Sequence, residues 1–158
     1  MNSTSLLTKL RSVIDNIAPS PETLARREVL AEQEACCALL MEVAQLGTAG
    51  AQQKLEVVAQ EMREQFAIAD QELAPMIANA GRPENRLTSY FKPVALINRR
   101  CAPERKVQFI ERLWRIAMAG GRTDMYQEQL VRILADLLYV SHADFILAKH
   151  RAQDGRGR

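Results

Sequence analysis

Residues 111–121 and 127–146 read ERLWRIAMAGG and QEQLVRILADLLYVSHADFI, and an earlier part of the 158-residue chain has the same plan. Residues 39–47 and 54–73 read LLMEVAQLG and KLEVVAQEMREQFAIADQEL. Each copy has apolar residues at helical spacing that end in small residues, then a turn, a second apolar helix and a shorter one. Two copies are too few for an extended array of repeats. The sequence therefore predicts two pseudo-repeated helical units packed around one core.

The remaining sequence is also helical in its pattern. Apolar residues recur every three or four positions along nearly the whole chain, and no stretch shows the strict alternation of a half-buried strand. Several helix starts are marked by capping residues, whose side-chain oxygens accept bonds from the free amides of the first turn. The caps that we expect are Ser20, either Thr123 or Asp124, and Ser141 together with Asp144. The sequence predicts an all-α fold.

The order of these helices divides the chain into three parts. We expect an N-terminal helical extension at 1–34, a single helical domain at 35–151 and a flexible basic tail at 152–158, with about seven to eight helices in all. One helix is expected over residues 83–99 and to bend near Pro93, because proline lacks an amide donor and crowds the preceding turn.

The composition is that of an ordinary globular protein, with 47% hydrophobic and 25% charged residues. No stretch approaches the roughly 18 consecutive apolar residues of a membrane span, and the first residues lack the basic start and apolar centre of a signal peptide. The three cysteines are an odd number and two are adjacent, which does not indicate a disulfide framework. We therefore expect a cytoplasmic protein with free thiols and no membrane span.

Charge is unevenly distributed along the chain. Residues 1–79 carry 6 basic and 11 acidic side chains, a net charge of −5, whereas residues 80–158 carry 15 and 8, a net charge of +7. Solvated helix faces commonly produce such a split, but it can also orient a protein toward an acidic partner. Aromatic residues are few at 5%, so we do not expect nucleic-acid binding. The candidate partner-binding residues are Arg99, Arg100, Arg105, Lys106, Arg112 and Arg115.

Enzyme chemistry has little support in the sequence. The two histidines, His142 and His150, both lie near the C-terminal end, and there is no glycine-rich phosphate loop or nucleophile elbow. Ser141, His142 and Asp144 do not form a triad, because neighbouring positions at a helix cap cannot converge on one reacting atom. We therefore expect a protein that is not an enzyme and has no cofactor.

Three stretches carry a resemblance to a known family. They are LINRR at residues 96–100, ERLWRIAMAGG at 111–121 and LVRILADLLYVSHADFILAKHR at 130–151. In these stretches, and more loosely over residues 35–151, the chain resembles the TerB-like tellurite-resistance proteins of bacteria. The resemblance implies a fold of seven or so helices in two pseudo-repeats and a role in survival of tellurite and other stresses. It implies no defined biochemical activity.

The resemblance also implies a pair of acidic positions in each repeat. The family has Ala-Asp-Gly after a long helix and a glutamate about seven positions beyond the aspartate, and such oxygen ligands suit calcium and magnesium. In this chain Gly120 and Gln127 stand at the acidic positions of the second repeat, and Gly47 and Lys54 stand at those of the first. Both acids are thus missing from both halves, and Lys54 adds a cation where a metal site tolerates none.

A weaker ion site remains an alternative. Asp124 and Glu128, with Glu56, would offer oxygen ligands, although a hard cation usually takes about six or more. The simpler interpretation is that residues 116–130 are a helix end with a double glycine, followed by a capped helix that keeps the family geometry without its ligands.

The cysteines offer a second chemical possibility. Thiolates are soft ligands that suit tellurium species or soft metals. Cys101 follows Arg99 and Arg100, whose charges favour a lowered pKa and a reactive thiol. Cys36 and Cys37 point in different directions on one helix and do not pair with each other. The more ordinary interpretation is that free cysteines are small core residues.

Together these observations predict a non-catalytic helical binding or scaffold module of a stress-response protein. It would act through an unknown protein partner or through its own oligomer. The alternative is a metal- or metalloid-binding protein that uses the remaining carboxylates or the cysteine thiolates, with only weak binding of a divalent metal.

Overall fold

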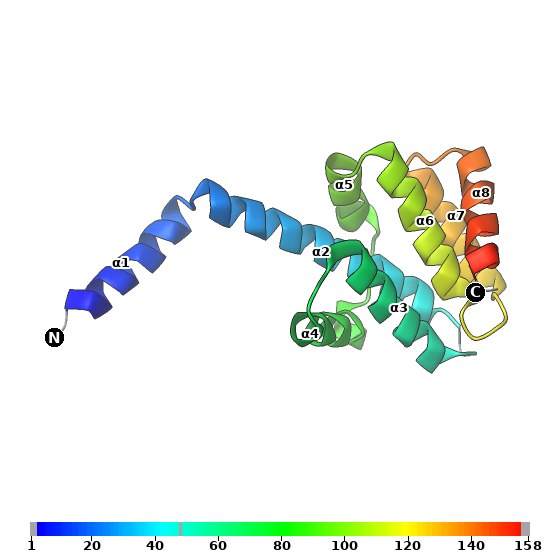
Figure 1. Cartoon of the computed structure of the whole chain (residues 1–158), viewed down its shortest axis with the longest axis horizontal. Coiled ribbons are helices and arrows are strands. Elements are labelled where there is room, and N and C mark those ends of the chain that lie inside the picture. The colour runs from blue at the N-terminus through cyan, green and yellow to red at the C-terminus, as the bar shows by residue number, and fades with distance from the viewer. Residues whose placement is uncertain (1–2, 48, 156–158) are drawn as a thin grey trace. The chain divides into compact units, whose positions relative to one another are not determined.

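The computed structural model describes residues 3–47 and 49–155, and for residues 3, 4 and 15 the backbone alone (Figure 1). Across these residues the chain forms eight α-helices, one short 3-10 helix and no strand, which confirms the predicted all-α class. The helices are α1 Ser3–Ile17, α2 Pro21–Gln45, α3 Ala51–Phe66, α4 Asp70–Ala80, the 3-10 helix η1 Pro83–Asn85, α5 Phe91–Arg100, α6 Pro103–Met118, α7 Met125–Leu137 and α8 His142–Asp154.

The chain divides into two compact units, Met1–Ala31 and Glu32–Arg158. The first contains α1 and the start of α2, and the second contains the rest of α2 and all the later helices. In the second unit α6 packs along α8 and α7 and also contacts α3 (Figure 1). No helix of the described residues has the length and apolar character needed to cross a membrane.

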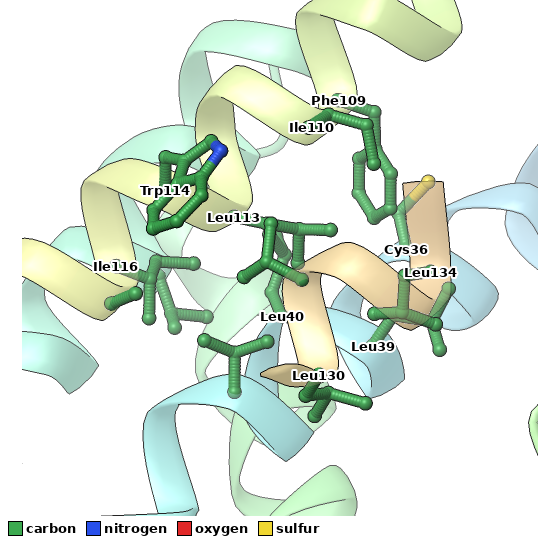
Figure 2. Close-up of a cluster of buried hydrophobic side chains, with 14 of the residues drawn as sticks. Cys36, Leu39, Leu40, Phe109, Ile110, Leu113, Trp114, Ile116, Leu130 and Leu134 are labelled. Atoms are coloured by element: carbon green, nitrogen blue, oxygen red, sulfur yellow. The ribbon is translucent and has the colours of Figure 1, made fainter. Parts of the chain in front are cut away.

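The core of the second unit is built where α2, α6 and α7 meet. Figure 2 shows apolar side chains from these three helices pointing toward one another. Trp114 of α6 is fully buried, and its ring lies 5.4 Å from the ring of Phe145 of α8, which joins α8 to the same core. The buried residues labelled in Figure 2 are Cys36, Leu39, Leu40, Phe109, Ile110, Leu113, Trp114, Ile116, Leu130 and Leu134.

The predicted caps at Ser20, Asp124 and Ser141 are present at the starts of α2, α7 and α8. The Ser20 hydroxyl accepts a hydrogen bond from the amide of Thr23 at the start of α2. Asp124 caps α7 in a capping box with Gln127, and the Ser141 hydroxyl accepts from the amide of Asp144 in α8. These bonds satisfy amides that have no partner inside the helix, so short local patterns mark where these three helices begin.

The segment before α5 differs from the prediction of one bent helix over residues 83–99. A 3-10 turn is followed by an irregular stretch with bends, and α5 begins only at Phe91. Glu42 of α2 holds this stretch, because its Oε1 accepts the amide of Leu87 at 3.0 Å while Arg86 binds both of its oxygens. Pro93 therefore lies in the first turn of α5, where its missing amide costs no helical hydrogen bond.

The C-terminal helix α8 extends into residues 152–154, which were predicted to belong to a flexible tail. It runs through Asp154, and Ala152, which would have begun the flexible segment 152–158, is fully buried. Residues 156–158 of that segment lie outside the described residues.

Candidate functional site

The loops that follow α2 and α6 touch each other through two glycines. Gly50 has a φ of 71° and Gly120 a φ of 84°, in the left-handed region that favours glycine. A Cβ atom on Gly50 would lie 2.8 Å from the Cα of Gly120, and a Cβ atom on Gly120 would lie 2.8 Å from the Cα of Gly50. The corresponding loops of the two repeats are therefore in contact at a distance that only glycine permits.

Beside this contact, a buried hydrogen bond joins the two repeats. Lys54 of α3 is 1% exposed and Gln127 of α7 is fully buried, and the Nζ atom of Lys54 donates to Oε1 of Gln127 at 2.9 Å. The Nε2 atom of Gln127 donates to the carbonyl of Val43 at 2.9 Å, while its Oε1 also accepts the amide of Asp124 at 3.3 Å. One amide side chain thus connects α2, α3 and the start of α7.

Three of the four positions that the family resemblance singled out, Gly47, Lys54 and Gln127, are therefore neighbours. Gly47 lies against the side chain of Gln127, because a Cβ atom placed on it would be 3.5 Å from the amide carbon. Gln127 bonds Lys54, and Gly120 lies against Gly50. Burial lowers the pKa of Lys54, although the nearby carboxylate of Asp124 acts in the opposite direction.

The side chains present do not fit a hard cation, because the buried position holds an ammonium group. The Asp124 carboxylate accepts the amide of Tyr126 at 2.7 Å as the cap of α7. Glu128 lies 3.5 Å from the ammonium of Lys149, and Glu56 is exposed on α3. Over residues 3–47 and 49–155 no three His, Cys, Asp or Glu side chains form a group that could hold a metal.

A second buried charge lies on α2. Glu32 is 4% exposed, and its carboxylate accepts from Arg100 at 2.8 Å and from Arg105 at 2.6 Å. Burial alone would raise the pKa of Glu32, but the hydrogen bonds and charges of the two arginines outweigh it, so this pKa lies below its usual value. Glu32 is therefore an ionised, paired carboxylate.

A third cluster joins α3 to α6. The Oε2 atom of Glu61 accepts from Arg112 at 2.6 Å and from Arg115 at 2.8 Å. Burial raises the pKa of Glu61 and outweighs the opposing charges of Arg115 and Arg112. The uneven charge of the sequence has a structural counterpart, because buried glutamates of the first half bind arginines of the second half.

These pairs change the role of the predicted basic surface. Arg100, Arg105, Arg112 and Arg115 all bind carboxylates of their own chain. The other two members, Arg99 and Lys106, form no ion pair with the described residues. Arg99 is exposed, and the ammonium of Lys106 lies 5.8 Å from the centre of the Tyr139 ring. Binding of an acidic partner through this surface stays a prediction.

Exposed apolar side chains at the start of α5 and at the end of α7, the latter beside Lys106, were not predicted. Phe91 is 76% exposed, Tyr139 is 84% exposed and Leu137 is 42% exposed. Asn98 donates to the carbonyl of Leu137 at 2.9 Å and so holds α5 against the end of α7. Phe91 is the first residue of α5, and its side chain is exposed there. We call Phe91, Leu137, Tyr139, Arg99 and Lys106 the α5–α7 surface.

A shallow groove lies in this surface. It measures about 390 Å³ and is bounded by apolar and hydroxyl side chains of the segment before α5, of α5 itself and of the end of α7. Its lining residues are Leu87, Thr88, Ser89, Tyr90, Phe91, Val94 and Leu137.

The thiols are less reactive in this environment than the sequence suggested. Cys36 and Cys37 are buried, and burial raises the pKa of both, that of Cys37 to about 12. Cys101 is half-buried, and burial raises its pKa despite the charge of Arg105. The arginines beside Cys101 are bound to Glu32, whose own negative charge also disfavours a thiolate.

Comparison with known proteins adds one finding. The family model described as "Tellurite resistance protein TerB" matches residues 33–150, well over half of the chain. The match includes both glycine loops and the Lys54–Gln127 contact. No curated protein and no solved structure was found to match the sequence.

Proposed function

Because the chain belongs to the TerB tellurite resistance family, we propose that it serves the stress response as a non-catalytic binding or scaffold module. The α5–α7 surface is the observation that carries this proposal. It combines strongly exposed aromatic side chains with two cations that no described carboxylate neutralises. Aromatic residues and arginine are enriched at protein interfaces, and exposed apolar surface is a common mark of a binding site.

The assignment of a non-catalytic role is supported by how the chemically active groups are used. The buried carboxylates of Glu32 and Glu61 bind arginines, and Glu42 holds the segment before α5. The thiols of Cys36 and Cys37 are buried and protonated at neutral pH. These groups stabilise the fold, whereas the α5–α7 surface presents side chains suited to an apolar partner with acidic neighbours.

The test is the survival of tellurite-treated cells whose own copy of the gene is replaced by variants. Arg99→Glu with Lys106→Glu should reduce survival, because the reversed charges repel an acidic partner. The matched control is Arg82→Glu with Arg122→Glu, which makes the same charge change at two other exposed arginines. Normal survival with the first pair, or equal loss with both pairs, would contradict a role for the α5–α7 surface.

The alternative of metal or metalloid binding is tested separately. Chelator-treated protein is unfolded by heat with calcium, magnesium, manganese, zinc or tellurite. A ligand that binds the native state stabilises it by about 2.7 kcal/mol at one hundred times its dissociation constant. A shift that is lost in Glu128→Gln or in Cys101→Ser would favour the alternative over a binding module.

A further inference from the structure

The first unit, Met1–Ala31, buries none of its described apolar side chains. Every leucine, valine and isoleucine between residues 5 and 31 is between 45% and 79% exposed. A unit of this size has too little interior to be stable by itself, since below roughly 40 residues a chain usually needs a partner, a metal or disulfides. The exposed residues are Leu6, Leu7, Leu10, Val13, Ile14, Ile17, Leu24, Val29 and Leu30.

The apolar side chains of α1 form one continuous face. Leu7, Leu10, Ile14 and Ile17 follow one another at intervals of three, four and three residues. This is the spacing of a seam that packs against another helix. Leu6 and Val13 widen the same face. A helix of 15 residues is only marginally stable when isolated in water, so α1 depends on whatever covers this face.

The chemistry of the unit argues against a lipid surface as that cover. Helices that lie in a membrane interface are rich in lysine and arginine on the polar face and have aromatic residues on the other. The described side chains of α1 include two basic residues, Lys9 and Arg11, and no aromatic residue. Electrostatic attraction to anionic lipid would therefore be small.

Charge also argues against a strongly acidic or basic partner protein. Residues 1–31 carry four basic and three acidic side chains, a net charge of +1. One basic and one acidic residue of this set pair with each other in α2, where Arg26 binds Glu22 at 3.0 Å. A nearly uncharged apolar face of this kind is complementary to a copy of itself, and a two-fold dimer places the same patch of each chain against the other.

The apolar surface is large enough for such a dimer. The six side chains of the α1 face, at these exposures, offer on the order of 500 Å² of apolar area per chain. A standard interface takes about 800 Å² from each partner, of which a little more than half is apolar. We propose that the apolar face of α1 forms the interface between two copies of this chain. This inference rests on the proposed binding function and names a second copy as one partner.

The test is the molar mass of the full chain in solution, measured by sedimentation equilibrium over a range of concentrations. The wild type should approach twice its chain mass of 17.8 kDa. Leu10→Glu with Ile14→Glu places two charges in the seam and should weaken the dimer by roughly a hundredfold or more. The matched control is Ser5→Glu with Ser12→Glu, which adds the same charges on the opposite side of the same helix.

The outcomes separate the possible occupants. A dimer that is lost in the leucine and isoleucine variant but kept in the serine variant supports the proposal. A wild type that is monomeric at every concentration overturns the proposal. Binding of that monomer to phosphatidylglycerol vesicles would instead identify a lipid surface as the cover of α1. Equal dissociation of both variants would contradict the assignment of Leu10 and Ile14 to the dimer interface. The thermal unfolding of the second unit should be unchanged in both, and the tellurite-survival test of Arg99 and Lys106 remains an independent measure of the proposed function.

Discussion

The ammonium group of Lys54 lies 2.9 Å from the side-chain oxygen of Gln127, and both residues are buried where the two helical repeats meet. The family resemblance places carboxylates at both positions. This chain instead joins its repeats by a hydrogen bond between a cation and an amide. This hydrogen bond between two side chains therefore stabilises the junction of the repeats.

Shortening Lys54 should weaken this junction. Lys54→Ala leaves a cavity and removes a donor from Gln127, and it should lower the free energy of unfolding by about 2–4 kcal/mol. Lys54→Met keeps most of the volume and should cost less than about 1.5 kcal/mol. Urea unfolding at neutral pH measures both. Equal losses in the two variants would show that filling the space is unimportant.

The same lysine should give the protein a distinct alkaline response. Because burial lowers the pKa of Lys54, the unfolded state binds more protons between that lowered pKa and the unfolded value of about 10.4. The cost of burying the charge is present below the folded pKa and is relieved as the pH rises through it. The unfolding free energy of the wild type should therefore increase relative to Lys54→Met over this range. A constant or decreasing difference would contradict the direction of the shift.

The acid response should depend on Glu32. Its pKa is lowered in the folded state by Arg100 and Arg105, which outweigh the effect of burial. Its stabilising contribution is therefore present above the unfolded pKa of about 4.3 and is lost as the pH falls through the folded pKa. Glu32→Gln should be less stable than the wild type at neutral pH, and the difference should shrink on acidification. Chemical unfolding at several pH values gives this difference directly.

The glycine contact should be intolerant of a single methyl group. Gly120→Ala brings a Cβ to 2.8 Å from the Cα of Gly50 and also strains a positive φ. Gly121→Ala serves as the control, because its φ of 100° is also positive while no atom lies within 4 Å of the added carbon. Gly120→Ala should lose about 1–3 kcal/mol more than Gly121→Ala, the usual cost of overpacking. Similar losses would mean that backbone strain alone matters.

The thiols should react in a fixed order. Cys101 is half-buried whereas Cys36 and Cys37 are 1% and 0% exposed, and all three have a raised pKa. Titration of the native protein with a thiol reagent should modify Cys101 slowly and the other two only on unfolding. Loss of the first phase in Cys101→Ser identifies it. Rapid modification of Cys36 or Cys37 in the native protein would contradict their burial.

Much of the fold was predictable because its signals are local. Ser20, Asp124 and Ser141 cap helices through groups two or three residues away, so their pattern is visible in a short stretch of sequence. The similarity of the two repeats also placed Lys54 and Gln127 at equivalent positions. The structure brings these two residues into contact.

The missed features depend on residues far apart in the chain. The late start of α5 follows from Glu42, which binds the amide of Leu87 across 45 positions. The arginines of the predicted basic surface are bound by Glu32 and Glu61, and no local pattern connects those glutamates with α6. The exposure of Tyr139, with its positive φ, likewise depends on how α7 ends.

The paired charges make each half of the chain the counterion of the other. Glu32, Glu42 and Glu61 come from the acidic half, and all the arginines that bind them come from the basic half. If the backbone were cut in the turn after α4, the two fragments would carry opposite net charge and complementary faces. The two fragments should therefore attract and bind each other, so the chain is suited to division into a split protein that reassembles from its fragments.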